Sequence, residues 1–192
     1  IILFLKNKGY RVFNENKIIT LSFIKKNNIQ YIICNGYPYK INSRIVKILK
    51  NKIINLHPAM LPQGKGVGAL LFCIIKKQKL GISIHFIDEE FDTGKIIYEK
   101  IVHPCIDETF RKYYLRLLDE LNNSFIKIFD SICNKSIKAK LQKNNNESSF
   151  YTRSKSEIVI EFFDSFYDIP IKELQNFSSG FAMNESFFEE IS

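Results

Sequence analysis

Apolar and polar positions along this chain form short stretches that predict strands and helices in turn. Apolar runs rich in β-branched residues predict strands at residues 10–13, 31–34, 53–56, 81–87 and 95–102. Apolar residues that recur every three to four positions predict helices at residues 1–9, 17–26, 43–50, 69–77 and 107–132. Strands separated by helices of this length are typical of right-handed crossovers, although the last two strands can pair antiparallel. The pattern therefore predicts an α/β fold, Rossmann-like and doubly wound, whose mostly parallel sheet has helices on both faces.

The two ends of the chain depart from this alternation. Ile1 to Gly9 is typical of the last turns of a helix closed by a glycine, so we expect the sheet to lack a first central strand. The polar run at residues 144–146 predicts a linker, with short helices after it. We therefore expect a main domain at residues 1–143 and a short helical C-terminal appendage at residues 144–192.

Charge is unevenly distributed between these two parts. The chain carries a net charge of +8, but from residue 157 onward eight acidic residues stand against the single Lys172, which gives −7. Residues 1–156 therefore carry +15, and the appendage is acidic. A basic body suits an anionic ligand, but it is equally consistent with a Lys- and Asn-rich solvated surface.

Apolar runs and cysteines limit the class of protein further. Every apolar run is too short to span a bilayer, because Lys or Asn interrupts each longer stretch. The four cysteines are irregularly spaced and form neither a C-x-x-C pair nor a zinc pattern. We expect a soluble, cytoplasmic protein with free thiols, no membrane partner and no metal.

Three polar residues at strand ends carry the strongest candidate chemistry. Asn55 and His57 lie where the strand at residues 53–56 ends, and Asp92 lies in a loop 35 residues after His57. Ligands of open parallel sheets bind at the carboxyl ends of the strands, so these side chains should meet there. An amide can donate to the oxyanion that forms when an amine attacks an acyl carbon, and an imidazole can relay the amine's proton. A carboxylate can orient that imidazole and raise its pKa. The three groups predict acyl transfer to an amine.

Neighbouring polar residues receive simpler interpretations. His85 lies inside an alternating strand and is interpreted as a residue of its polar face. The acidic loop Asp88–Glu90 is interpreted as solvated, with its backbone rather than its carboxylates facing a ligand. Lys65 and Gly66 are candidates for substrate binding, because the glycines around Lys65 permit close approach to a phosphate.

These motifs together resemble the folate-dependent formyltransferase family. The resemblance covers about residues 29–130 and rests on the order and spacing of Asn55-Leu56-His57-Pro58-Ala59-Met60-Leu61-Pro62, Lys65-Gly66, Gly81-Ile82-Ser83-Ile84-His85-Phe86-Ile87-Asp88-Glu89 and Phe91-Asp92-Thr93-Gly94. The family includes glycinamide ribonucleotide transformylase, methionyl-tRNA formyltransferase and the sugar-nucleotide N-formyltransferases.

The resemblance implies a donor, a triad and a donor site. Residues 1–143 would be the formyltransferase catalytic domain, with 10-formyltetrahydrofolate as formyl donor and Asn55, His57 and Asp92 as the catalytic triad. The folate would lie against Gly36, Tyr37, Pro38, Tyr39, Lys40, Ile41, Ile87, Asp88, Glu89 and Glu90.

The acceptor is predicted to be a small molecule. The tRNA enzymes of the family carry a substantial basic C-terminal domain, whereas residues 157–192 are short and acidic, which disfavours nucleic acid. The spacing of the early segments resembles the compact sugar-nucleotide enzymes, so a nucleotide-linked amino-deoxysugar is favoured. Glycinamide ribonucleotide, methionyl-tRNA and a catalytically inactive relative that binds a nucleotide or folate remain open alternatives. A homodimer is also left open.

Overall fold

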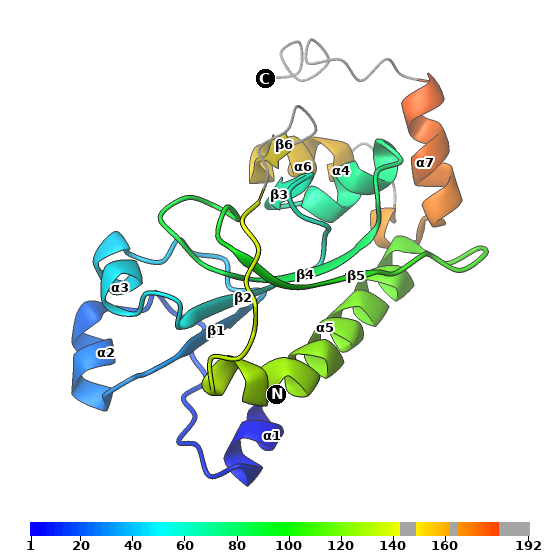
Figure 1. The fold of residues 1–192 in the computed structure, drawn as a ribbon. Coiled ribbons are helices and arrows are strands. Elements are labelled where there is room, and N and C mark those ends of the chain that lie inside the picture. Colours follow the sequence, from blue (N-terminus) through cyan, green and yellow to red (C-terminus); the bar gives the residue numbers. More distant parts are fainter. Residues whose placement is uncertain (143–148, 162–164, 181–192) are drawn as a thin grey trace.

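A computed structural model describes residues 1–142, 149–161 and 165–180 and shows an α/β fold with helices on both faces of a central sheet (Figure 1). The strands of the sheet, in spatial order, are β1 (Ile32–Asn35), β2 (Ile53–His57), β4 (Gly81–Phe86) and β5 (Ile96–Ile101). Two shorter strands pair with each other as a separate ribbon: β3 (Gly64–Gly66) and β6 (Ser149–Tyr151). The helices are α1 (Ile2–Asn7), α2 (Leu21–Asn27), α3 (Ser43–Ile48), α4 (Ala69–Ile75), α5 (Phe110–Cys133), α6 (Arg153–Glu161), the short 3-10 helix η1 (Phe166–Asp168) and α7 (Ile171–Gly180).

The described sheet is mixed rather than mostly parallel. β1 and β2 pair in parallel, whereas β4 is antiparallel to both β2 and β5. The predicted antiparallel pairing of the last two strands is thus confirmed, and the α/β class with helices on both faces holds. The sequence pattern predicted that β4 runs parallel to β2, and this prediction is wrong. A helix between two strands is compatible with either direction of the second strand.

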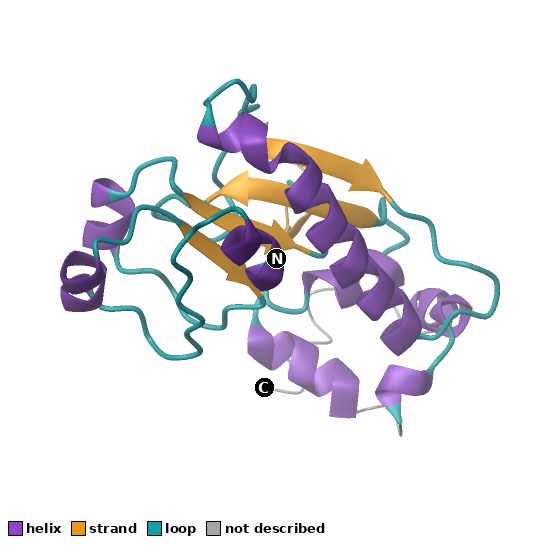
Figure 2. Cartoon of the chain, turned by 90° about the horizontal axis from the view of Figure 1, so that it is seen from below, coloured by secondary structure: helices purple, strands orange, loops and turns teal. Residues whose placement is uncertain are grey.

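Two helices, α4 and α5, lie on opposite faces of the sheet and supply much of the core (Figure 1). All seven residues of α4 are buried, so this helix has no polar face. α5 lies across the opposite face of the sheet (Figure 2) and buries one stripe of residues spaced three or four apart. Its start is set by Thr109, whose side chain accepts a hydrogen bond from the Lys112 backbone N–H at 3.4 Å.

The N-terminal segment is helical, as predicted, but no strand follows it. α1 is followed by Gly9, whose φ of +84° is a conformation that favours glycine. Residues 10–13 form no strand in the structure, which corrects the sequence prediction. The apolar side chains there pack on helices instead, with the Tyr10 and Phe129 ring centroids 5.5 Å apart. Alternation in this segment therefore reflects packing and not strand pairing.

The C-terminal elements pack against the main body. The backbone N–H of Ile171 donates to Glu108 O at 2.9 Å, and that of Phe110 donates to Ile169 O at 2.9 Å. β6 adds to the body through its pairing with β3. The division at residues 143 and 144 stays a prediction, because the boundary falls at the edge of the described residues.

Candidate active site

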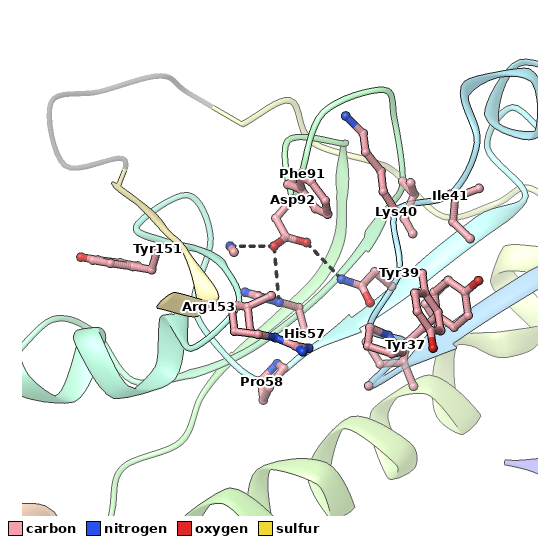
Figure 3. A pocket seen from close by; sticks show the side chains of 18 of the residues that line it. Tyr37, Tyr39, Lys40, Ile41, His57, Pro58, Phe91, Asp92, Tyr151 and Arg153 are labelled. Carbon is pink, nitrogen blue, oxygen red and sulfur yellow. Dashed lines mark hydrogen bonds and ion pairs between the residues drawn. The ribbon is translucent and has the colours of Figure 1, made fainter. Parts of the chain in front are cut away.

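The three predicted catalytic residues line one pocket beside the carboxyl end of β2 (Figure 3). Asn55 and His57 stand two positions apart on β2, so their side chains share a face of the sheet. Asp92 reaches them from the loop between β4 and β5. The pocket has a volume of about 330 Å³, which is within the range of small-molecule sites.

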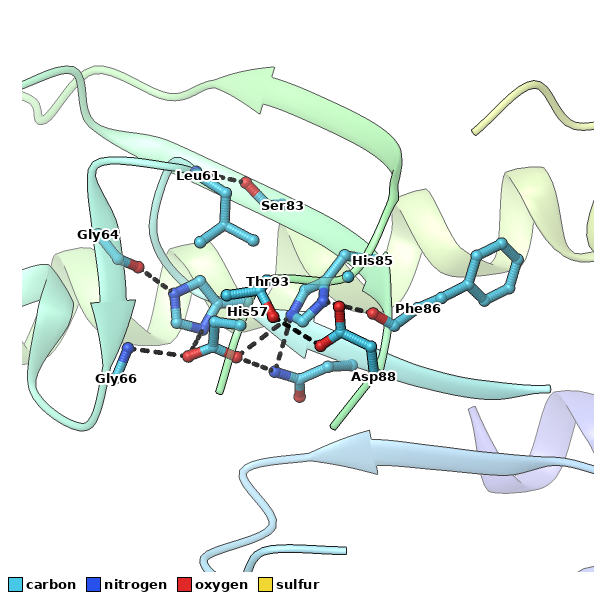
Figure 4. Close-up of polar contacts among 12 residues, drawn as sticks. His57, Leu61, Gly64, Gly66, Ser83, His85, Phe86, Asp88 and Thr93 are labelled. Carbon is cyan, nitrogen blue, oxygen red and sulfur yellow. Dashed lines mark hydrogen bonds and ion pairs between the residues drawn. The ribbon is translucent and has the colours of Figure 1, made fainter. Parts of the chain in front are cut away.

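Backbone geometry directs Asp92 into the pocket. Asp92 has a φ of +54°, a strained value for a residue with a side chain. Gln142 stabilises this turn, because its side-chain nitrogen donates to the backbone oxygens of Asp92 and Gly94, both at 2.8 Å. The carboxylate accepts from the Gly66 N–H at 2.8 Å and from the Asn55 amide at 3.1 Å. The loop of β3 and the end of β2 thereby hold one carboxylate (Figure 4).

His85 belongs to the same cluster, although its place in an alternating strand predicted only a polar-face residue. It is 1% exposed, and its Nε2 lies 3.3 Å from Asp92 Oδ1 and 3.1 Å from the Asn55 amide nitrogen. Its Nδ1 lies 2.8 Å from the Phe86 carbonyl oxygen, which can only accept, so Nδ1 carries a hydrogen. Nε2 is therefore the nitrogen that faces the Asn55 amide and the Asp92 carboxylate.

The orientation of His57 follows from the same reasoning. Its Nε2 lies 2.6 Å from the Gly64 carbonyl oxygen and must donate to it, which leaves Nδ1 3.9 Å from Asp92 Oδ2. Burial lowers the pKa of His57, and the neighbouring Asp92 carboxylate offsets only part of that effect. Asp92 thus raises the pKa of this imidazole as expected, but burial outweighs its effect and the net shift is downward. His57 is neutral near pH 7, with Nδ1 as the nitrogen that can accept a proton.

For the pKa of Asp92, the effect of neighbouring groups outweighs the effect of burial. Burial raises the pKa of its carboxyl group, but His57, His85 and the Gly66 N–H together lower that pKa by more. The net shift is downward from the ordinary value of 3.8, so the group is ionised at neutral pH. A buried, ionised carboxylate beside a neutral imidazole is suited to accepting a proton or to stabilising a cationic intermediate.

The predicted donor-site residues lie along one side of the pocket, with one exception. Tyr37 and Tyr39 are in edge contact at 5.5 Å between ring centroids, and Lys40 Nζ lies 5.2 Å from the centroid of the Phe91 ring. Glu89 does not line the pocket and pairs instead with Lys47 at 3.5 Å. The other predicted residues line it: Gly36, Tyr37, Pro38, Tyr39, Lys40, Ile41, Ile87, Asp88 and Glu90. Aromatic and aliphatic groups together suit a flat heteroaromatic ring.

The two predicted substrate-binding residues differ in their relation to the pocket. Gly66 lines the pocket, but Lys65 does not, and its side chain is 6% exposed.

A further wall of the pocket had no signal in the sequence motifs. It consists of residues 150–153, from the end of β6 to the first residue of α6. These residues come more than fifty positions after Asp92, and their place depends on the pairing of β6 with β3.

Two classes of feature are not found in the described part of the chain. Residues 1–142, 149–161 and 165–180 contain no group of three or more His, Cys, Asp or Glu side chains arranged to hold a metal ion. None of the helices described in these ranges is long and apolar enough to cross a membrane. The cysteines are free thiols, with Cys34 and Cys73 buried.

Comparison with known proteins places these features in context. Residues 4–129 match the profile of a family described as formyl transferase. A solved structure described as the formyltransferase PseJ from Anoxybacillus kamchatkensis, in complex with UDP-4,6-dideoxy-4-formamido-L-AltNAc and tetrahydrofolate, has a TM-score of 0.83 and 28% identity. The match covers 89% of each chain.

Two curated relatives are matched over shorter stretches. The chloroplastic phosphoribosylglycinamide formyltransferase of Arabidopsis thaliana is 26% identical over 140 residues, which are 67% of this chain and 48% of that protein. The GDP-perosamine N-formyltransferase of Brucella melitensis is 35% identical over 79 residues, 41% of this chain and 30% of that protein. The matched part of the chain thus spans about half or less of the length of these two relatives.

Proposed function

The chain belongs to the formyl transferase family, and we propose that it transfers a formyl group from 10-formyltetrahydrofolate to the primary amine of a nucleotide-linked amino-deoxysugar. The observation that carries the proposal is the contact of Asn55, His85 and the Gly66 N–H with one ionised carboxylate, Asp92, in a pocket that His57 also lines. The pocket therefore combines hydrogen-bond donors with a proton acceptor.

The donor site is proposed along the Tyr37–Ile41 side. The pterin of a tetrahydrofolate has a flat pyrimidine ring and several hydrogen-bonding groups, so aromatic side chains and loop backbone suit it. Tyr37 is held in place by its own contacts, because its hydroxyl accepts from the Ile19 N–H at 3.0 Å and donates to Lys17 O at 3.2 Å. The Anoxybacillus and other relatives with tetrahydrofolate or folinic acid in their descriptions support a folate donor.

The catalytic steps follow from the position of each polar group. When the amine attacks the formyl carbon, the formyl oxygen becomes negative and the amine nitrogen positive. One hydrogen of the Asn55 amide is donated to Asp92, and the second is available to that oxyanion or to His85. One well-placed donor contributes about 2.7–4 kcal/mol to stabilisation of such a transition state.

Proton removal is assigned to His57, with support from Asp92. His57 Nδ1 accepts the proton of the amine, while Nε2 remains bonded to Gly64 O. The Asp92 carboxylate at 3.9 Å, a distance that one water can bridge, stabilises the resulting imidazolium. Collapse of the tetrahedral intermediate then breaks the bond from carbon to the folate nitrogen, which takes up the proton held by His57. The products are the formamide and tetrahydrofolate, and His57 is neutral again.

The choice of acceptor rests on how much of each relative is matched. The Anoxybacillus formyltransferase, with a formamido sugar nucleotide in its description, is matched over most of both chains. Glycinamide ribonucleotide is the second candidate, because the relative from Arabidopsis thaliana is a phosphoribosylglycinamide formyltransferase.

Mass spectrometry of product formation tests the function directly. The protein is incubated with 10-formyltetrahydrofolate and, separately, with UDP-, GDP- and dTDP-linked amino sugars, glycinamide ribonucleotide and charged initiator tRNA. A mass increase of one formyl group, about 28 Da, on an amino sugar nucleotide and not on the other acceptors is expected. Formylation of glycinamide ribonucleotide alone would replace the sugar assignment, and no formylation of any amine would favour a catalytically inactive binding protein.

A further inference from the structure

The wall at residues 150–153 is fixed to the catalytic centre. β6 pairs with β3 in the register Gly66↔Tyr151, and Gly66 is the residue whose N–H bonds Asp92. The ring of Tyr151 stacks on Phe72 with centroids 4.4 Å apart and an interplanar angle of 5°. One turn into α6, the Ser156 hydroxyl donates to Val67 O at 3.1 Å. The first residue of α6 therefore has a defined position relative to Asp92.

That first residue is Arg153, and it lines the pocket. In Figure 3 its side chain extends from the wall opposite Tyr37, Lys40 and Ile41 toward the middle of the pocket, which His57 also lines. In residues 1–142, 149–161 and 165–180, the Arg153 guanidinium has neither a hydrogen bond nor an ion pair within the protein. Two arginines outside the pocket are engaged, Arg111 with Asp168 at 3.0 Å and Arg116 with Glu108 at 2.7 Å.

The two basic side chains of the pocket lie on different sides of it. Among the described residues that line the pocket, Lys40 and Arg153 are the two with Lys or Arg side chains. Lys40 lies over the Phe91 ring on the proposed folate side, whereas Arg153 stands on the side of His57 and Pro58. An anion bound at Arg153 would therefore belong to a second molecule. That molecule would approach the catalytic residues from the side of the pocket opposite the folate.

We propose that Arg153 is the residue that recognises the acceptor by binding its diphosphate. A guanidinium presents paired N–H donors that match phosphate oxygens, which makes arginine well suited to this group. The carboxylates of the folate glutamate offer similar chemistry, but they belong to the donor, so the two sources are separable by experiment. This inference rests on the proposed function, because it assumes an acceptor that carries a diphosphate.

Kinetics and direct binding test the inference with three variants. R153Q removes the charge, R153K keeps it without the paired donors, and R44Q changes an exposed arginine on α3 that does not line the pocket. R153Q should raise KM for the nucleotide-linked acceptor about 10–100-fold, with R153K intermediate and R44Q like the unmodified protein. The KM for 10-formyltetrahydrofolate should stay within about twofold in all three.

Calorimetric titration with UDP, GDP and dTDP makes the test independent of catalysis. The nucleotide that binds the unmodified protein should bind R153Q about 10–100-fold more weakly and R44Q unchanged. Equal binding to R153Q, or an effect confined to the KM of the folate, would overturn the inference and leave formyl transfer intact. If no nucleoside diphosphate binds at millimolar concentration, the inference also fails, and formylation of an amine without a diphosphate would show that the proposed transfer survives.

Discussion

Asn55 on β2 lies directly opposite His85 on β4, and the Asn55 amide nitrogen is 3.1 Å from His85 Nε2. The same Nε2 lies 3.3 Å from the Asp92 carboxylate, while Nδ1 is held by the Phe86 carbonyl. One buried imidazole therefore positions two of the three proposed catalytic groups. The antiparallel pairing of β2 with β4 creates this arrangement.

Replacing His85 by Ala should lower kcat about 10–100-fold, because Asn55 and Asp92 lose a shared partner and shift from their productive positions. His85→Gln keeps a donor near Asp92 and should recover part of the loss. Steady-state kinetics measured across pH 5.5–8.5 would show both the lower kcat and a changed pH profile, which a purely structural role would not alter.

His103→Ala is the matched control for that change, because His103 is exposed and lies outside the pocket. It should retain the kcat of the unmodified protein. A kcat for His85→Ala that equals that of the control would contradict the positioning role.

Asp92→Asn should depress kcat about 10²–10⁴-fold, since the amide preserves the shape of the carboxylate but cannot stabilise an imidazolium at His57. The folate KM should change little, because the proposed folate side is formed by other residues. Single-turnover formylation, followed by mass spectrometry, measures the chemical step. The surface variant Asp119→Asn should behave like the unmodified protein, and similar rates for the two variants would remove Asp92 from the mechanism.

The free energy of unfolding should fall as the pH drops below about 6.5, because burial lowers the pKa of His57 in the folded state. The unfolded chain then binds more protons than the folded chain, so acid favours unfolding. Asp92 adds a second loss below about pH 4, where its unfolded carboxyl takes up a proton but the folded one does not.

Urea unfolding at several pH values between 8 and 5 measures the His57 contribution. His57→Gln should flatten the dependence in this range, whereas His103→Gln should keep it. An unchanged slope in His57→Gln would show that His57 gains its proton equally in both states.

Gly66→Ala should destabilise the protein and weaken formylation together. Gly66 has a φ of +91°, and an added Cβ would overlap the carbonyl oxygen of Tyr151 and push β6 away from β3. Gly9→Ala is the control for backbone strain alone, because Gly9 has a φ of +84° and open space around an added Cβ. Strain of this kind costs about 1 kcal/mol or more.

Chemical unfolding and formylation rates of these two glycine variants separate the effects. Gly66→Ala should lose more stability than Gly9→Ala, and only Gly66→Ala should lose activity. Equal losses would mean that contact between β3 and β6 contributes nothing beyond the glycine conformation.

Local sequence patterns predicted much of the fold and part of the candidate active site. Apolar periodicity predicted α4, α5 and the sheet strands, because these elements bury most of one face or all of their surface. The N-terminal helix was predicted from its closing glycine. Asn55 and His57 could be paired from sequence since residues two apart on a strand share a face, and the spacing of Asp92 matched the family resemblance.

Other features depended on pairing between distant segments. His85 looked like an ordinary polar strand residue until β4 was placed antiparallel to β2, which brings it opposite Asn55. Lys65 was predicted to bind a phosphate, but in the structure it is buried and does not line the pocket. The alternation at residues 10–13 resembled a strand, but these side chains pack on helices, Tyr10 on α5 and Phe13 on α2.

The sequence by itself thus determined the α/β class, the helices, most strands and the chemical types at the end of β2, because propensity and periodicity act over a few neighbouring residues. Tertiary structure alone decided the direction of β4 against β2, the inclusion of His85, the lowered pKa of His57 and the place of Arg153 in the pocket. These features depend on strand register, desolvation and contacts between segments far apart in the chain, and local patterns carry no information about which distant segments will meet.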